Sequence, residues 1–195
     1  MALGVAYLSA AGKTPATAVP TELGGSTLKP GVYSSGTFGL NNTLTLDAGG
    51  DANAIFVFQS ADTLITASGS HVNLINGATA CNVFWQVSTS ATLGSGSSFS
   101  GNILALTSIS LDAGATVDGR ALARNGSVTL QANTITKPTC APSQVAAVPT
   151  GPISTGDGST SAGTSTAPYA AIGTLMISGI GAATLVAVRR RRLDI

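Results

Sequence analysis

Between Leu40 and Thr136 the chain repeats a short phrase in which polar and apolar residues alternate. A small residue, usually Ser or Thr, is followed by a mostly apolar residue, then by Ser or Thr, and then by Leu. The five copies are Thr43-Leu44-Thr45-Leu46, Ala61-Asp62-Thr63-Leu64, Ser90-Ala91-Thr92-Leu93, Ser108-Ile109-Ser110-Leu111 and Ser127-Val128-Thr129-Leu130. Their leucines are 18, 29, 18 and 19 residues apart. Repetition at about 20 residues predicts a mainly β protein, a β-solenoid whose coils bury apolar side chains by stacking on one another.

The alternation predicts two outward columns of small hydroxyl side chains, because neighbouring residues of a strand point to opposite faces. With the leucines inside, one column holds Thr45, Thr63, Thr92, Ser110 and Thr129. The other column holds Thr43, Ala61, Ser90, Ser108 and Ser127. Strands stack about 4.8 Å apart and alternate residues lie about 7 Å apart, so we expect a regular grid of hydroxyls. Asp62 would point inward, so its copy belongs to an edge coil or is out of register.

A second kind of run lies between these copies and is apolar at consecutive positions. The runs are Ile55-Phe56-Val57-Phe58, Val83-Phe84-Trp85-Gln86-Val87, Ile103-Leu104-Ala105-Leu106 and Ala121-Leu122-Ala123-Arg124. Such runs are typical of strands that are buried on both faces. We therefore expect another element to cover one wall of the solenoid and to leave the hydroxyl wall open.

The composition argues against several classes of function. Only 9% of the 195 residues are charged and 24 are glycine, so the surface consists largely of small polar side chains. Four of the nine basic residues are Arg189 to Arg192, which leaves the solenoid without a basic stripe for nucleic acid. One histidine and two cysteines do not form a zinc site, and no motif indicates another metal, a cofactor or a small-molecule substrate.

The residues before the repeats read as a helix followed by loops. In residues 1–12 apolar residues recur at spacings of three and four, and Gly12 stands where a C-terminal cap is expected. Residues 13–39 contain three prolines and several glycines, which predicts loops with short strands. No signal peptide is recognisable at the start of the chain.

The amino-acid composition of the chain changes after Cys140. Residues 141–167 are rich in Ser, Thr, Gly and Pro, the composition of an extended linker. Residues 168–188 carry no charge and have the length of a bilayer span; a buried helix is the alternative. The basic tail, residues 189–195, then predicts a cytoplasmic C-terminus. We expect a membrane-anchored cell-surface protein with the solenoid, residues 1–140, outside.

An outside location permits Cys81 and Cys140 to oxidise. The bond would close a loop of about 60 residues, which stabilises a fold by about 3 to 4 kcal/mol when unstrained. Two unpaired cysteines are the alternative, and we favour the disulfide.

Four phrases, taken in order along the chain, resemble the large microbial family of ice-binding proteins built on a discontinuous β-solenoid, formerly a domain of unknown function. They are Leu28-Lys29-Pro30-Gly31-Val32-Tyr33, Ala80-Cys81-Asn82-Val83-Phe84-Trp85-Gln86-Val87, Gly101-Asn102-Ile103-Leu104-Ala105-Leu106 and Gly119-Arg120-Ala121-Leu122-Ala123-Arg124. The resemblance runs from about residue 5 to Cys140.

The resemblance implies a right-handed triangular β-solenoid with one packed α-helix, and adsorption to ice through a flat face. Family domains normally begin with several strands before the helix, so we expect the N-terminal coils to be missing here. Some active members carry a Thr-Ala/Gly-x-Thr/Asn pattern on the ice face. Imperfect copies in this chain are Thr66-Ala67-Ser68-Gly69, Ser95-Gly96-Ser97-Ser98 and Gln131-Ala132-Asn133-Thr134.

Three functions remain to be weighed. We favour ice binding through the two hydroxyl columns, that is Thr43, Thr45, Thr63, Ser90, Thr92, Ser108, Ser110, Ser127 and Thr129. A cell-surface adhesin or structural spacer without ice activity is the alternative. An enzyme is not expected. Glycoside hydrolysis needs two facing carboxylates, whereas Asp47 and Asp112 stand in nearly identical Leu-Asp-Ala-Gly turns, where Asp favours turn geometry.

Overall fold

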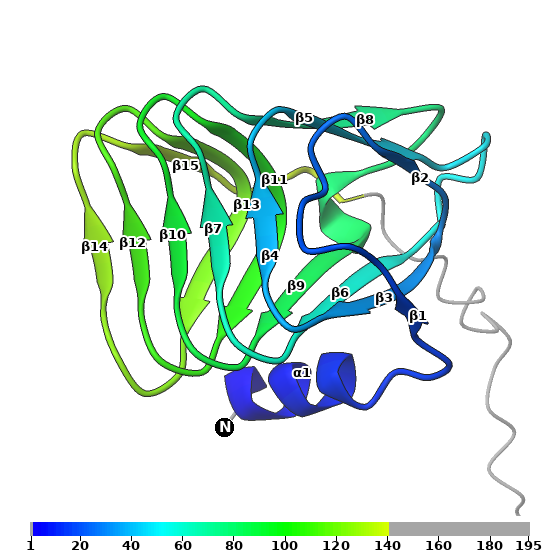
Figure 1. Ribbon diagram of the computed structural model, residues 1–195, viewed down its shortest axis with the longest axis horizontal. Coiled ribbons are helices and arrows are strands. Elements are labelled where there is room, and N and C mark those ends of the chain that lie inside the picture. The colour runs from blue at the N-terminus through cyan, green and yellow to red at the C-terminus, as the bar shows by residue number, and fades with distance from the viewer. Residues whose placement is uncertain (1, 141–195) are drawn as a thin grey trace, which may run out of the picture. The chain divides into compact units, whose positions relative to one another are not determined.

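The computed structural model describes residues 2–140, which belong to the first of two units, Met1–Ala146 and Ala147–Ile195 (Figure 1). The expected linker (141–167), membrane span (168–188) and basic tail (189–195) lie outside the described residues. Within residues 2–140, no helix is both long enough and apolar enough to cross a membrane.

The described part begins with a helix and continues as short strands. The elements are α1 (Ala2–Ala11), β1 (Thr17–Ala18), β2 (Thr27–Leu28), β3 (Gly31–Ser35), β4 (Phe38–Leu40), β5 (Thr43–Asp47), β6 (Phe56–Ser60), β7 (Leu64–Thr66), β8 (His71–Ile75), η1 (Ala80–Asn82), β9 (Val83–Val87), β10 (Ala91–Leu93), β11 (Ser98–Ala105), β12 (Ile109–Leu111), β13 (Thr116–Ala123), β14 (Val128–Leu130) and β15 (Thr134–Thr136). The helix expected over residues 1–12 and the short strands expected within residues 13–39 are thereby confirmed.

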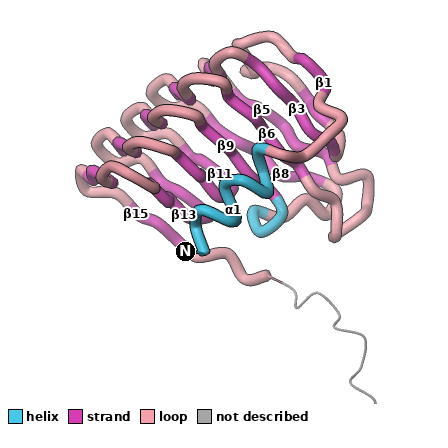
Figure 2. The backbone as a smooth tube through the Cα atoms, turned by 90° about the horizontal axis from the view of Figure 1, so that it is seen from below, coloured by secondary structure: helices cyan, strands magenta, loops and turns pink. Residues whose placement is uncertain are grey.

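The strands wind into coils with three walls, and every strand pairing is parallel (Figures 1 and 2). The helix wall consists of β1, β3, β6, β9 and the second halves of β11 and β13. The long-strand wall consists of β2, β5, β8, β15 and the first halves of β11 and β13. The short-strand wall consists of β4, β7, β10, β12 and β14. The solenoid predicted from the repeat is confirmed, whereas its right-handed winding stays a prediction.

Apolar side chains from all three walls fill the interior of the coils. Among the fully buried residues are five aromatic ones, Phe38, Phe56, Phe58, Trp85 and Phe99. Phe58 and Trp85 stack with their ring centroids 3.9 Å apart, and the indole nitrogen of Trp85 donates a hydrogen bond to the carbonyl oxygen of Ser100. Stacked coils thus share one continuous core, as the repeat predicted.

The α1 helix lies along the helix wall and gives that wall a second buried face (Figure 2). Tyr7 and Ala10 of the helix pack against Val57 and Leu104, which point outward from β6 and β11. The Gln59 side chain donates hydrogen bonds to the carbonyl oxygens of Ala10, Ala11 and Lys13 at and just beyond the C-terminal end of the helix. The expectation that another element covers the consecutive apolar runs is therefore confirmed over the part of the wall that α1 contacts.

A disulfide closes the described part of the chain. Cys81, in the short η1 helix before β9, is bonded to Cys140, and their Cα atoms are 5.6 Å apart. The pairing favoured from the sequence is confirmed.

Candidate functional site

The α1 helix leaves the long-strand wall and the short-strand wall uncovered (Figure 2). Each of these walls presents stacked columns of outward side chains, because parallel strands in register align equivalent positions of successive coils. Both walls are candidate sites, since the hydroxyl residues predicted from the sequence are divided between them.

The short-strand wall carries most of the predicted hydroxyl residues. The middle residues of its strands align in the order Gly39, Ile65, Thr92, Ser110 and Thr129. The residues just before these strands form a second column of Thr37, Thr63, Ser90, Ser108 and Ser127, which is linked through backbone hydrogen bonds to the next coil. Three of the predicted positions in the first column and four in the second therefore lie on this wall.

Many hydroxyls of the short-strand wall are recessed or already engaged. Thr92 and Ser110 are only half-exposed. The hydroxyl oxygens of Ser90 and Ser108 accept hydrogen bonds from the backbone amides of Ser108 and Ser127, at 3.3 and 3.4 Å. These serines support the stacking of the coils and offer less to an outside surface than the sequence suggested.

The expected columns were wrong at their first two copies. Thr43 and Thr45 belong to β5 and lie on the long-strand wall. Thr63 aligns with Ser90 and not with Thr92, because Leu64 pairs with Ala91. The second copy is thus shifted by two residues, one of the two alternatives that Asp62 raised.

The side chains around the shifted copy explain why the shift is tolerated. Asp62 is exposed before β7, and its carboxylate accepts a hydrogen bond from the Thr89 hydroxyl. Thr66 occupies the inward position of leucine in the other coils, and its hydroxyl oxygen accepts a hydrogen bond from the Gly94 amide. A buried threonine with a satisfied hydroxyl can replace a leucine in the core.

The long-strand wall has a more exposed column of polar side chains. Its order is Thr43, His71, Ser98, Thr116 and Thr134, and each neighbouring pair is in register. All of these residues are exposed except Thr43, which is half-exposed. Four of the five side chains carry a hydroxyl.

A second column runs beside the first on the long-strand wall. One part of it aligns Thr27, Thr45 and Asn73, and the other aligns Ser100, Asp118 and Thr136. Asn73 follows His71 by two residues and Ser100 follows Ser98 by two, so the two parts continue one another. The wall therefore offers two outward positions on β8, β13 and β15, whereas Ser100 in β11 is buried and its hydroxyl donates a hydrogen bond to the carbonyl oxygen of Val72.

The turns that lead into this wall also stack. The amides of Gly69, Gly96 and Gly114 donate hydrogen bonds to the carbonyl oxygens of Ser95, Ala113 and Gln131 in the next coil, at 2.9, 3.0 and 3.2 Å. Two of the imperfect Thr-Ala/Gly-x-Thr/Asn copies, 95–98 and 131–134, span these turns and end on the first column at Ser98 and Thr134. The third copy, 66–69, stops two residues before His71.

Thr116 of the exposed column was missed from the sequence, and Ser98 and Thr134 were recognised only within the imperfect ice-face copies, not as site residues. A signal was present, because Ala113-Gly114-Ala115-Thr116 occupies the same turn as the imperfect copy at 95–98. The more regular Ser/Thr-x-Ser/Thr-Leu repeat lies mostly on the neighbouring wall and does not include Thr116.

Several carboxylates of the described residues serve in turns. Asp47 accepts hydrogen bonds from the Gly49 amide and the Asn76 side chain, and these hold the pKa of its carboxyl below the ordinary value. Asp51 accepts a hydrogen bond from the Asn53 amide. The similar turns of Asp47 and Asp112 are not equivalent, because Asp47 ends a strand of the long-strand wall and Asp112 follows one of the short-strand wall.

Comparison with known proteins identifies one family. The family model described as ice-binding-like matches residues 1–136. The chain is 57% identical over 116 residues to an ice-binding protein of Nostoc sp. (strain HG1), a match that covers 58% of this chain and 43% of the relative. It is 43% identical over 141 residues to an ice-binding protein of Colwellia sp., with 70% of this chain and 54% of the relative covered. The chain thus spans about half the length of these relatives.

Solved structures agree with this assignment. An ice-binding protein from the Antarctic ascomycete Antarctomyces psychrotrophicus superposes with a TM-score of 0.66 at 43% identity, covering 69% of this chain and 67% of that one. A domain of an ice-binding protein of Shewanella frigidimarina superposes with a TM-score of 0.68 at 36% identity, covering 70% and 60%.

Proposed function

The chain belongs to the ice-binding-like family, and we propose that it adsorbs to ice through the long-strand wall of its solenoid. The observation that carries the choice of wall is the exposed column of Thr43, His71, Ser98, Thr116 and Thr134, aligned through four coil-to-coil pairings. The family is not an enzyme family, and no catalytic step is proposed.

Ice is a periodic surface, so its binder needs a periodic array that keeps its shape. Strands of a wall stack about 4.8 Å apart and alternate residues lie about 7 Å apart, which spaces the side chains in two directions. Threonine adds a methyl and a hydroxyl on a stiff side-chain torsion, so little conformational entropy is lost on contact. The coil core and the stacked turns hold this array in place.

Two features favour the long-strand wall over the short-strand wall. Its hydroxyl residues Ser98, Thr116 and Thr134 are exposed, whereas Thr92 and Ser110 are half-buried. The turns that contain the imperfect copies of the ice-face pattern at 95–98 and 131–134 also lead into this wall. The short-strand wall, with Thr63, Ser90, Thr92, Ser108, Ser110, Ser127 and Thr129, is the alternative ice face.

A pair of bulky substitutions distinguishes the two walls. We expect Thr116→Tyr to remove ice shaping and most of the thermal hysteresis, because a protruding ring prevents close approach of the wall to ice. Thr92→Tyr places the same ring on the short-strand wall and should leave both activities unchanged. Circular dichroism and the melting temperature should match the parent in both variants.

The reverse pattern, with activity lost only in Thr92→Tyr, would move the ice face to the short-strand wall. Round ice crystals from the well-folded parent would instead contradict ice binding and favour the adhesin or structural spacer.

We also propose that residues 168–188 anchor the protein in a membrane, with the solenoid outside the cell and Arg189 to Arg192 in the cytoplasm. The support is the uncharged run of bilayer length followed by four arginines. Cleavage after Gly151 on intact cells should release a soluble solenoid. A solenoid that stays in the membrane fraction after this cut, or that is protected from an external protease, would contradict the arrangement.

A further inference from the structure

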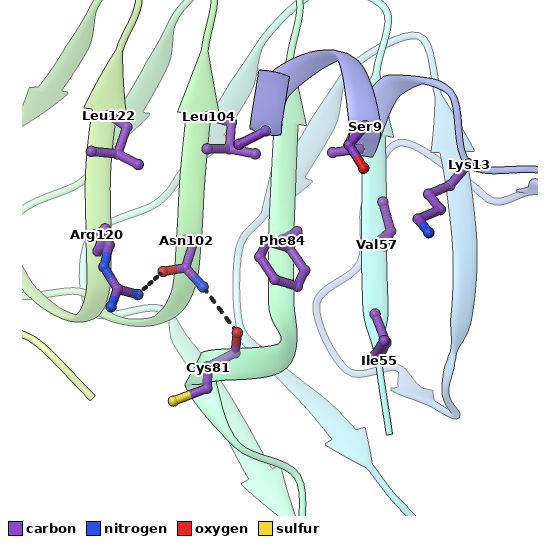
Figure 3. Close-up of a pocket in the computed structure, with 12 residues that line it drawn as sticks. Ser9, Lys13, Ile55, Val57, Cys81, Phe84, Asn102, Leu104, Arg120 and Leu122 are labelled. Carbon is purple, nitrogen blue, oxygen red and sulfur yellow. Dashed lines mark hydrogen bonds between the residues drawn. The ribbon is translucent and has the colours of Figure 1, made fainter. Parts of the chain in front are cut away.

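The helix wall is covered along only part of its width. A groove of about 510 Å³ runs beside α1 across β6, β9, β11 and β13 (Figure 3). The apolar lining of its floor includes Ile55, Phe84 and Leu122, together with Val57 and Leu104, which are already buried beneath α1; Asn102 and Arg120 add polar groups at one side. These side chains point outward from the strands, so the groove is separate from the core inside the coils.

The helix does not fill this groove. Ile55 is 51% exposed and Phe84 is half-exposed, although both belong to the wall that has the apolar composition of a doubly buried sheet. Large apolar side chains gathered in one groove are more informative than single exposed ones, because a continuous apolar surface favours a covering element. A segment running alongside α1 would bury these residues.

The position of Cys140 favours the segment that follows it as the occupant of the groove. Cys81 lines the groove, and the disulfide holds the Cα of Cys140 5.6 Å from the Cα of Cys81. Arg120, which also lines the groove, borders a smaller hollow formed with residues 137–140. The disulfide therefore places Cys140, the last described residue, beside the rim of the groove.

We propose that residues 141–146, Ala-Pro-Ser-Gln-Val-Ala, dock in this groove as an extended segment and cover the exposed half of the helix wall. The segment has no charge, and four of its six residues are apolar. Six extended residues span about 20 Å. Crossing from β6 to β13 takes three strand spacings, about 14 Å, so the segment is long enough.

Because the disulfide tethers the segment beside the groove, a low intrinsic affinity is enough to keep the segment bound. A segment tethered at the rim of its site binds intramolecularly, at an effective concentration in the millimolar range for a short linker. In an extended chain Val145 and Gln144 point to opposite sides. The apolar floor assigns Val145 to the groove and Gln144 to solvent.

Site-specific photocrosslinking in the full-length chain tests the docking. We expect a benzophenone amino acid at position 145 to crosslink to peptides that contain Phe84, Leu104 or Leu122 of the same molecule. The same label at Thr155, beyond the proposed segment, serves as the control and should not form these crosslinks. Equal crosslinking from both positions, or crosslinks from 145 only to a second copy of the chain, would overturn the proposal.

A matched pair of variants adds a second readout. Val145→Asp places a charge against the apolar floor and should lower the melting temperature of the solenoid by about 2 °C or more. Gln144→Asp adds the same charge on the side assigned to solvent and should change the melting temperature by less than about 1 °C. Equal effects of the two variants would contradict the docked orientation. Neither variant alters a wall proposed to contact ice, so ice shaping should persist in both.

Discussion

At the scale of single residues, Asp47 shows how a carboxylate of this solenoid acts on stability rather than on chemistry. Its oxygen accepts hydrogen bonds from the Gly49 amide at 2.9 Å and from the Asn76 side chain at 2.8 Å. These bonds favour the ionised form and lower the pKa of the carboxyl in the folded protein. Asn76 belongs to the loop that follows β8, so the ionised carboxylate links the ends of two neighbouring strands.

We expect the contribution of Asp47 to depend on pH in one direction. Because its folded-state pKa lies below the unfolded value of about 3.9, the stabilisation is present above that pH and is lost as the pH falls through the folded-state pKa. Asp47→Asn keeps an oxygen acceptor but cannot titrate. Urea unfolding at a series of pH values between about 5 and 2 should therefore show a steeper loss of stability in the parent. Parallel curves for the two proteins would refute this role.

At the scale of elements, the corner between the long-strand wall and the helix wall depends on two glycines. Gly101 and Gly119 are aligned in β11 and β13, at the point where both strands pass from one wall to the other. Gly119 has φ +154°, and a β-carbon there would overlap the backbone carbonyl of Gly101. Successive coils can approach this closely only where neither residue has a side chain.

We predict that Gly119→Ala lowers the free energy of unfolding by about 3 kcal/mol, because the backbone of the neighbouring coil has to move. Gly36→Ala is the matched control, since its φ is not positive and a β-carbon would meet open space. It should be neutral or stabilising by up to about 1 kcal/mol. Denaturant unfolding measures both, and an equal loss in the two variants would show that the corner tolerates a side chain.

Elements were easier to predict than their register. Alternation and consecutive apolar runs identified strands and the covered wall, because burial determines both patterns. Which wall a strand joins depends on its pairing partners in other coils. Two strands with similar local sequences can have different partners. Thr43-Leu44-Thr45-Leu46 resembles Ser108-Ile109-Ser110-Leu111, yet the two lie on different walls because their pairing partners differ.

Prediction of the candidate site was limited by register in the same way. The hydroxyl positions were recognised as outward, which is a local property of a strand. Their grouping into columns required the alignment of Leu64 with Ala91, and the buried Thr66 hid that alignment by replacing a core leucine. A single satisfied polar side chain in the core was enough to shift the expected columns by two residues.

At the scale of the whole described unit, a solenoid is held together mainly by contacts between neighbouring coils, so its terminal coils are its weakest part. Val128, Leu130 and Ile135 in the last strands are 38%, 53% and 40% exposed. The Cys81–Cys140 bond opposes separation of this coil, because it joins a residue that follows β15 to the start of β9, across the intervening β11 and β13.

We expect reduction of this disulfide to lower the melting temperature by about 10 °C or more. The bond closes a loop with a sequence separation of 59 residues, which corresponds to about 4 kcal/mol of chain entropy in the unfolded state. The reductant should leave a Cys81→Ser/Cys140→Ser double variant unaffected, and that variant should melt at the temperature of the reduced parent. Thiol alkylation before and after reduction establishes the redox state. An unchanged melting temperature after complete reduction would show that coil stacking alone holds the last strands in place.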